Sequence, residues 1–209
     1  MGAFVGLLSG SIAWTAALAL PDLPAAILGV ALAVGTTGAL HLDGLADTAD
    51  GVGASLAGGE PADAMADPRL GTWGGAVLVL DLLLRVTVLS TLLGDGRFPW
   101  AAVAAGALSR TSIVALAWAV PYGGPDHGTG AWTLGLGGRR CLTGVVIGVG
   151  IGVLTVGVRL VPMIAIAALI CVPIAWWSKA RLGGMRGDTF GAAAEATETL
   201  ALTPSLIAI

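Results

Sequence analysis

Charged side chains are scarce in this chain, since only 11% of its 209 residues are Asp, Glu, Lys or Arg, whereas 56% are hydrophobic. A soluble domain carries about 25% charged residues. The composition therefore excludes an ordinary water-soluble enzyme and a disordered tail. Ten basic residues stand against thirteen acidic ones, so there is no positive field to attract nucleic acid. The class that remains is an integral membrane protein.

Cysteine is equally rare. Cys141 and Cys171 stand far apart inside apolar stretches, which excludes a disulfide framework and a C-x-x-C metal site. We interpret both as small apolar packing residues. The first apolar run has no basic segment before it, which excludes a signal peptide. The apolar runs show no period-two alternation, so they predict helices and not barrel strands.

Long charge-free runs predict an all-α fold, a polytopic transmembrane helical bundle that forms one integral membrane domain over residues 1–209. A bilayer core about 30 Å thick needs about 20 apolar helical residues, which gives about six to seven spans. The tail Gly191–Ile209 is either a seventh, short span or a helix packed inside the bundle. The other predicted spans are Ala3–Leu20, Pro24–Leu40, Gly75–Leu93, Pro99–Val120, Thr143–Val158 and Leu160–Ser178.

The loop charges predict an orientation in the cell membrane. The polar segments 41–74, 121–142 and 179–190 all fall on the side of the N-terminus. A transporter would place polar groups near the midplane, so this arrangement favours an enzyme that uses cytosolic substrates. The side richer in basic residues is expected to be cytoplasmic. The N-terminal side carries Arg69, Arg139, Arg140, Lys179, Arg181 and Arg186, and the opposite side carries only Arg97 and Arg159.

The most informative segment is HLDGLADTADG, residues 41–51. Asp43, Asp47 and Asp50 follow one another at spacings of four and three, so a helix places them in one stripe. Like charges on one face repel, at larger cost near lipid. A hard divalent cation such as Mg²⁺ removes that repulsion and prefers oxygen ligands. The alternative is a solvated acidic helix start, which the apolar flanks disfavour.

Two further polar blocks follow. In DPRLGTWGG, residues 67–75, a Gly-rich backbone stands beside an arginine and a hydroxyl; it is either a phosphate cradle or an ordinary loop. In the block 181–198, Glu195 and Glu198 share one helix face and Asp188 precedes or caps that helix. The two glutamates need a cation or an arginine as partner, unless the helix dipole alone accounts for them.

Charges and glycines inside the apolar runs predict helix contacts. Arg110 is costly unless it faces the bundle interior and meets a carboxylate or a phosphate. Asp81 and Arg85 are four residues apart and form a candidate neutralising pair. The doubled G-x-x-x-G of residues 144–152 predicts close helix contact, either within one chain or between protomers of a homo-oligomer.

Together these features favour phosphoryl transfer assisted by a divalent metal, with carboxylates on the metal and arginines on phosphate oxygens. The bilayer location suits an amphipathic or lipid-like substrate. No Ser-His-Asp or Cys-His set accompanies them. One rival is a CDP-alcohol phosphotransferase-like lipid enzyme, whose D-G-x-x-A-R pattern fails because residue 48 is Thr. The other is a cation-coupled transporter that uses the aspartates as ion ligands.

The three blocks resemble the cobalamin synthase family, also called adenosylcobinamide-GDP ribazoletransferase. Residues 41–51 look like its most distinctive signature, residues 67–75 are similar to its D-x-R-x-G-x-x-G segment, and residues 187–198 to its G-D-x-x-G-A-x-x-E-x-x-E segment. The resemblance implies a Mg²⁺-dependent inner-membrane transferase of late cobalamin biosynthesis. It would join adenosylcobinamide-GDP to α-ribazole or its 5′-phosphate and release GMP. In the family a Thr-Arg-x-Pro-like stretch precedes the first span, whereas Met1 here opens almost directly into that span, and Asp81 is a second departure.

The combined hypothesis assigns a role to each candidate residue and names corrinoid and nucleoside substrates and the bilayer as partners. Asp47 or Asp50 is the expected base toward the ribazole hydroxyl. Arg69 and Arg110 are expected to bind phosphate. His41, Gly71, Gly74 and Arg186 are expected to contact substrate. The expected Mg²⁺ ligands are Asp43, Asp47, Asp50, Asp67, Asp188, Glu195 and Glu198.

Overall fold

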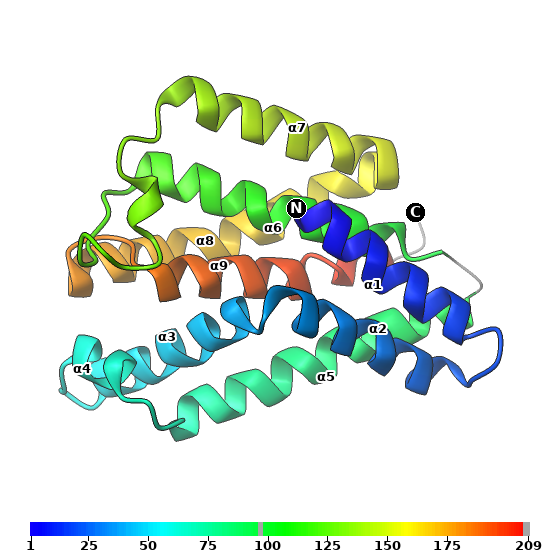
Figure 1. The fold of residues 1–209 in the computed structure, drawn as a ribbon, viewed down its shortest axis with the longest axis horizontal. Coiled ribbons are helices and arrows are strands. Elements are labelled where there is room, and N and C mark those ends of the chain that lie inside the picture. The colour runs from blue at the N-terminus through cyan, green and yellow to red at the C-terminus, as the bar shows by residue number, and fades with distance from the viewer. Residues whose placement is uncertain (96–97, 207–209) are drawn as a thin grey trace.

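A computed structural model describes residues 1–95 and 98–206, so Arg97 and the end of the predicted tail span lie outside the described residues. Within that range the chain is all-α, which confirms the predicted fold class (Figure 1). The long helices form from the apolar runs. The helices are α1 Gly2–Ala16, α2 Asp22–Thr37, α3 Leu40–Leu56, α4 Pro61–Ala66, α5 Thr72–Gly94, α6 Trp100–Ala119, α7 Gly138–Val156, α8 Leu160–Leu182 and α9 Gly187–Leu200.

Fewer segments qualify as membrane spans than the sequence predicts. Among the described residues, three helical segments are long and apolar enough: Thr72–Gly94, Trp100–Ala119 and Gly138–Leu182. The pair α2–α3 makes up to four, but it is bent by 87°. The prediction of six to seven also counted α1, which has only 15 residues. It counted α7 and α8 separately, and the segment Gly138–Leu182 does begin and end at the same end of the bundle, as two spans would (Figure 1). The tail, predicted as a short span or as a helix packed inside the bundle, forms α9, which is not among these candidates and is mostly buried, as the second alternative requires.

The bend between α2 and α3 comes from two consecutive left-handed residues. Gly38 ends α2 with φ 60°, the usual glycine cap, and Ala39 follows with φ 57°. An L-residue rarely adopts this backbone conformation. The bend turns α3 away from the direction of α2, and so the acidic half of α3 extends toward the loops at one end of the bundle (Figure 1).

Small residues let the helices approach closely. A Cβ on Gly6 of α1 would overlap the backbone of Ala102 on α6. Gly148 of α7 lies against Thr111 of α6, and Gly152 lies against Leu160 at the start of α8. The close contact predicted from the doubled G-x-x-x-G is therefore made within one chain. Met163, Val88 and the alanines of α6 form the core beside them.

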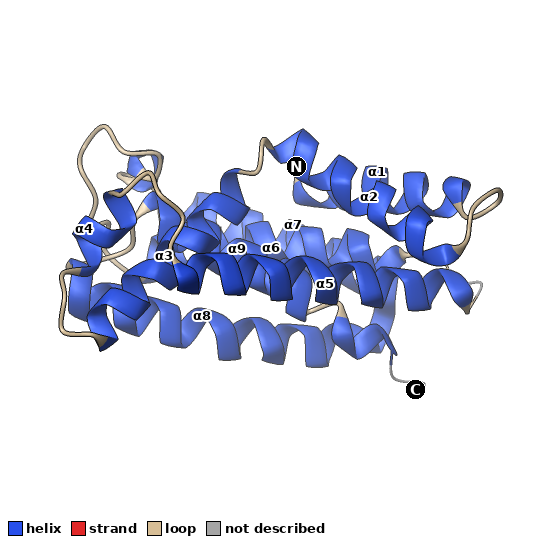
Figure 2. Cartoon of the chain, turned by 90° about the horizontal axis from the view of Figure 1, so that it is seen from below, coloured by secondary structure: helices blue, strands red, loops and turns tan. Residues whose placement is uncertain are grey.

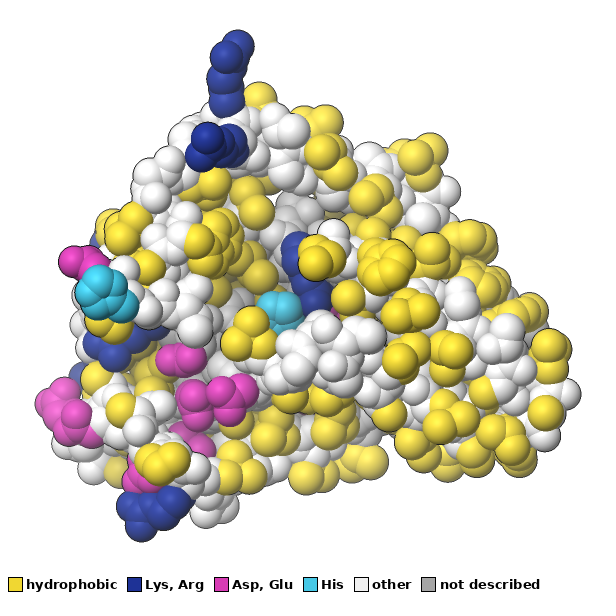
Figure 3. Space-filling view, in the orientation of Figure 1, with side chains coloured by type: hydrophobic (Ala, Val, Ile, Leu, Met, Phe, Trp, Pro, Cys, Tyr) yellow, Lys and Arg dark blue, Asp and Glu magenta, His cyan; other side chains and the backbone are white. Residues whose placement is uncertain are grey.

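The polar segments gather at one end of the bundle. The C-terminal ends of α3, α6 and α8, the N-terminal ends of α5, α7 and α9, and the short α4 all lie there (Figure 1). Figure 2 shows the longer loops collected at the same end, and Figure 3 shows most of the visible acidic side chains on it. The remaining surface is rich in apolar side chains such as Leu154, Trp176 and Leu169, as a lipid-facing surface requires.

Candidate active site

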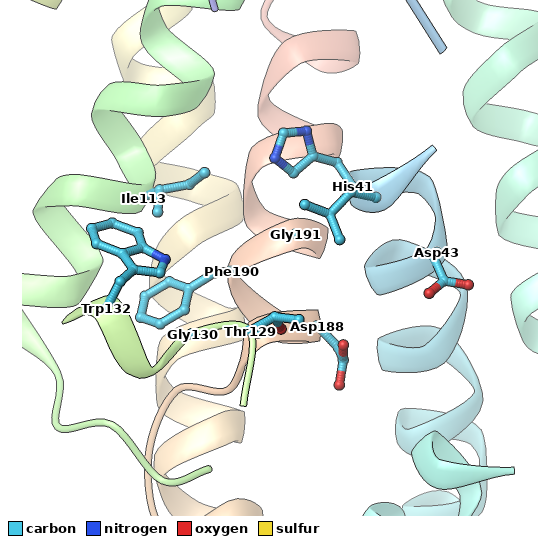
Figure 4. A pocket seen from close by; sticks show the side chains of 11 residues that line it. His41, Asp43, Ile113, Thr129, Gly130, Trp132, Asp188, Phe190 and Gly191 are labelled. Carbon is cyan, nitrogen blue, oxygen red and sulfur yellow. The ribbon is translucent and has the colours of Figure 1, made fainter. Parts of the chain in front are cut away.

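Helices α3 and α9 touch at two glycines, and this contact builds the site. A Cβ on Gly44 would lie 2.6 Å from the carbonyl oxygen of Asp188, and a Cβ on Gly191 would lie 3.4 Å from Cα of Gly44. Any larger side chain at residue 44 would therefore push the helices apart. Because the backbones approach so closely, Asp43 on α3 lies beside Asp188 in the first turn of α9 (Figure 4).

Three of the predicted metal ligands interact at this contact. The charge of Asp47 acts on those of Asp43 and Asp188. Burial, and then the charge of Asp43, raise the pKa of Asp188 above its ordinary value, against the opposing effect of Arg186. Within residues 1–95 and 98–206, however, no three acidic, histidine or cysteine side chains already stand close enough to share one metal ion. The carboxylates converge without forming a closed cluster.

Asp43 lies on the wall of two cavities. The first, which we call the aromatic cavity, has a volume of about 220 Å³ and lies between the start of α3, the α6–α7 loop and the start of α9 (Figure 4). Ile113, Trp132 and Phe190 lie on one side of it, and the carboxylates of Asp43 and Asp188 on the other. Its lining residues include Ile113, Trp132, Phe190, His41, Asp43 and Asp188.

The second, which we call the acidic cavity, has a volume of about 620 Å³ and lies between α3, the α4–α5 loop and α5. Its polar wall carries Asp43, Asp47, Asp67 and Arg69. The Arg69 guanidinium donates to Asp67 at 2.6 Å and stays largely exposed. The hydrogen bonds from Arg69 lower the pKa of Asp67 to about 2. Both residues therefore lie at the rim of this cavity as an exposed ion pair.

Asp50, predicted as a metal ligand or base, is bound by backbone N–H groups in the structure. Its two carboxylate oxygens each accept a backbone N–H, one from Gly71 and one from Gly74, at 2.8 Å. Side chains at either glycine would overlap this carboxylate. The two glycines predicted to contact substrate thus bind Asp50 instead. The carboxylate fastens the start of α5 to α3 and positions the wall of the acidic cavity.

Glu195 and Glu198 also depart from the predicted metal shell. Both are buried and pair with Arg85 of α5, at 3.0 Å and 3.3 Å. Glu198 makes a second ion pair with Arg110 of α6. Since buried carboxylates need these cations, they are committed to the bundle interior. The sequence predicts that Arg85 pairs with Asp81, four residues before it on the same helix. In the structure, the ion pairs of Arg85 are with the two glutamates of α9.

Arg110 meets a carboxylate, which is one of its two predicted partners. Besides Glu198, its guanidinium lies 3.1 Å from Ser109 Oγ and 3.3 Å from Nδ1 of His41. The predicted phosphate contact is not favoured, because the buried Glu198 needs Arg110 as a counterion, unlike Asp67, whose ion pair with Arg69 is exposed to solvent. His41 lies at the edge of the aromatic cavity, so it connects the buried ion-pair network with the site.

Arg186 and the α6–α7 loop complete the site. The Arg186 N–H donates to Thr189 Oγ1 at 2.8 Å and caps α9, while its buried Nε has no hydrogen-bond partner among the described residues. Trp132, Thr129 and Phe190 line the aromatic cavity, and sequence analysis missed them. The only signal for Trp132 was an aromatic residue inside a Gly-rich loop on the polar side.

Comparisons with known proteins agree with this arrangement. A family model described as "Cobalamin-5-phosphate synthase" matches residues 1–206. No solved structure matches the chain significantly.

Curated relatives carry the name adenosylcobinamide-GDP ribazoletransferase. The protein of Klebsiella pneumoniae (strain 342) is 36% identical over 204 residues, covering 95% of this chain and 82% of the relative. The protein of Stutzerimonas stutzeri (strain A1501) is 40% identical over 206 residues, with the same two coverages. The protein of Azorhizobium caulinodans is 36% identical over 223 residues, covering 99% and 81%. The chain therefore belongs to the cobalamin-5-phosphate synthase family.

Proposed function

We propose that this chain transfers ribazole to adenosylcobinamide-GDP at the polar end of its bundle, with that end facing the cytoplasm. The observation that carries the proposal is the position of Asp43, which lies on the wall of both cavities. Two substrates held in separate cavities can meet at this carboxylate. Family membership disfavours the lipid phosphotransferase and the transporter. The six basic loop residues on this side support the cytoplasmic orientation.

We propose further that Asp43, Asp47 and Asp188 bind Mg²⁺. Their donors are hard oxygen atoms, and their mutual repulsion needs a cation. A closed protein cluster is not required, since Mg²⁺ in phosphoryl-transfer sites is usually held by one or two carboxylates, water and substrate phosphates. When bound, the ion would neutralise charge that develops on the diphosphate.

The residues themselves supply positioning and proton transfer. Asp47 is the proposed base, since Asp50 is occupied by backbone N–H groups; it accepts the proton of the ribazole hydroxyl. That oxygen then bonds to the phosphorus next to the corrinoid, and the bond from this phosphorus to the oxygen of GMP breaks. The unpartnered Nε of Arg186 and the exposed guanidinium of Arg69 are the proposed phosphate contacts.

The test is incubation of purified protein with adenosylcobinamide-GDP, α-ribazole and Mg²⁺, with chromatographic detection of GMP and the coupled corrinoid. Asp47→Asn is expected to lower turnover by about 100-fold or more, while membrane insertion stays normal. Asp63→Asn, which removes an exposed carboxylate outside both cavities, is the matched control. Near-normal GMP release by Asp47→Asn would contradict the assignment.

Metal removal tests the Mg²⁺ proposal separately. Because the carboxylates repel without a cation, treatment with EDTA is expected to stop GMP release, and added Mg²⁺ or Mn²⁺ should restore it. Mg²⁺ should also raise the unfolding temperature of the wild-type protein, since it binds the folded state. Full activity in EDTA would refute a metal-dependent reaction.

A further inference from the structure

The aromatic cavity has a composition that selects one of the two substrates. We propose that it binds the base of the nucleoside, α-ribazole, through Trp132, with Ile113 and Phe190 beside it, while the acidic cavity receives the diphosphate end of the corrinoid. This inference rests on the proposed function. It adds a specificity-determining residue, Trp132, to a loop in which sequence analysis found no function.

The first argument is the division of the cavity wall. Ile113, Trp132 and Phe190 lie on one side, whereas Asp43 and Asp188 lie on the other (Figure 4). A nucleoside has the same division, with a flat base at one end and a hydroxylated sugar at the other. A base between the apolar side chains therefore directs its ribose toward the carboxylates where transfer is proposed.

The second argument distinguishes the two bases that the substrates contain. Guanine, in the GDP group, carries donors and acceptors along its edge, and burying them without partners is costly. Dimethylbenzimidazole, the base of α-ribazole, is an apolar bicyclic ring with two methyl groups. The side chains of Ile113, Trp132 and Phe190 offer a single hydrogen-bond donor, the indole N–H, so this part of the wall suits the apolar base. The polar part of the lining, Thr129, His41, Asp43 and Asp188, is left for the ribose.

The third argument is size. The aromatic cavity holds about 220 Å³, against about 620 Å³ for the acidic cavity. The diphosphate end of the corrinoid, which continues into a macrocycle too large for either cavity, needs the larger of the two, and the rim of that cavity carries the exposed Arg69 guanidinium suited to phosphate. Asp43, on the wall of both, is then where the ribazole oxygen and the diphosphate come together.

The turn that carries Trp132 is held in place by its own hydrogen bonds. It is a 3-10 turn, Ala131–Thr133, in which Thr133 N–H and its hydroxyl both bond to the Gly130 carbonyl, at 3.1 Å and 2.8 Å. The same loop is fastened to the start of α9 through Gly123 N–H, which donates to the Met185 carbonyl at 2.8 Å. The indole is half exposed, at 56%, so it has surface left for a base to cover.

The experiment measures each substrate separately. In Trp132→Ala, the KM for α-ribazole should rise about five- to tenfold, as loss of one aromatic stacking partner predicts, while the KM for adenosylcobinamide-GDP stays within about twofold. Trp132→Phe should keep most of the α-ribazole affinity. The matched control is Trp118→Ala, an exposed tryptophan at the end of α6 that lines neither cavity.

Equilibrium dialysis with labelled α-ribazole alone gives a result that does not depend on turnover. Weaker binding to folded Trp132→Ala than to wild type supports the assignment. Equal binding overturns it, and so does a rise confined to the corrinoid KM, which would place guanine in this cavity. Wild-type protein that binds α-ribazole but releases no GMP would overturn the proposed function and leave the base site standing.

Discussion

At the scale of single residues, a carboxylate's partners decide what it can do. Asp50 accepts two backbone N–H groups, and Glu195 and Glu198 form ion pairs with arginines. Asp43 and Asp188 face a cavity and each other. The first group fastens helices together, and the second is left available for a cation. One residue type thus serves structure or chemistry according to its neighbours.

The ionised Asp188 carboxylate is expected to lower the stability of the folded protein when no cation is bound. Its pKa is raised in the folded state, so its ionisation opposes folding above its ordinary pKa, and the penalty disappears as pH falls below that value. Without Mg²⁺, Asp188→Asn should therefore have a higher unfolding temperature at pH 7, and the difference should vanish under acidic conditions. The half-saturating Mg²⁺ concentration should rise by about tenfold or more.

Thermal unfolding in detergent, measured across pH and with or without Mg²⁺, checks this prediction. Mg²⁺ should stabilise the wild type more than the variant. Asp126→Asn, an exposed aspartate that lines neither cavity, provides the control. If Asp188→Asn is less stable than wild type at every pH, the ionised Asp188 carboxylate does not destabilise the fold, and the prediction is wrong.

Arg85 is the opposite case, a buried cation whose loss should unfold the protein. Arg85→Met leaves Glu195 without its arginine, and removing one partner of a buried pair costs about 3–5 kcal/mol. Titration with denaturing detergent, followed by circular dichroism, measures the loss. Adding Glu195→Gln should recover part of it, because Glu198 still has Arg110. No loss in the single variant would mean that the network contributes little to the fold.

At the scale of helices, the contact of α3 with α9 decides whether the site exists. Its two glycines carry no side chain that would separate the backbones. The bend at Gly38 and Ala39 directs α3 into this contact, and the Asp50 bonds hold the start of α5 against α3. The site is therefore a property of how these elements meet.

Gly44→Ala tests the helix contact. The added methyl group would lie 2.6 Å from the Asp188 carbonyl, a backbone atom, so α9 must shift. A displacement of about 1 Å at a reacting centre costs about 100-fold in rate, and GMP release should fall on that order. Gly35→Ala on α2 meets nothing within 4 Å. It should keep full activity and gain about 0.5–1 kcal/mol of stability. Equal activity of the two variants would refute the packing argument.

At the scale of the whole molecule, the bundle separates apolar surface from chemistry. Polar loops, most of the visible acidic side chains and both cavities lie at one end, while the flanks expose leucines, valines and tryptophans. This arrangement lets water-soluble nucleotides reach the site from one compartment. It also predicts that reagents confined to that compartment reach only that end.

The topology prediction uses single cysteines. Cys141 and Cys171 are buried, so they should react little with a charged maleimide. His127→Cys, in the exposed α6–α7 loop, should be labelled in inverted membrane vesicles and protected in right-side-out vesicles if its end faces the cytoplasm, as proposed. Leu18→Cys, exposed at the other end, should give the reverse pattern. Labelling of both positions from one side would contradict the proposed orientation.

The sequence by itself determined the membrane class, the helical fold and the segments that form the site. Low charge and long apolar runs are properties of composition, and helical spacing alone places Asp43 and Asp47 on one face. The tertiary structure decided which carboxylates are available. Ion pairs such as Arg85 with Glu195 join residues more than a hundred positions apart, and charge counting along a chain cannot choose among such partners. It also decided that Trp132 faces Asp188 across a cavity, because that juxtaposition arises only when the loop packs on α9.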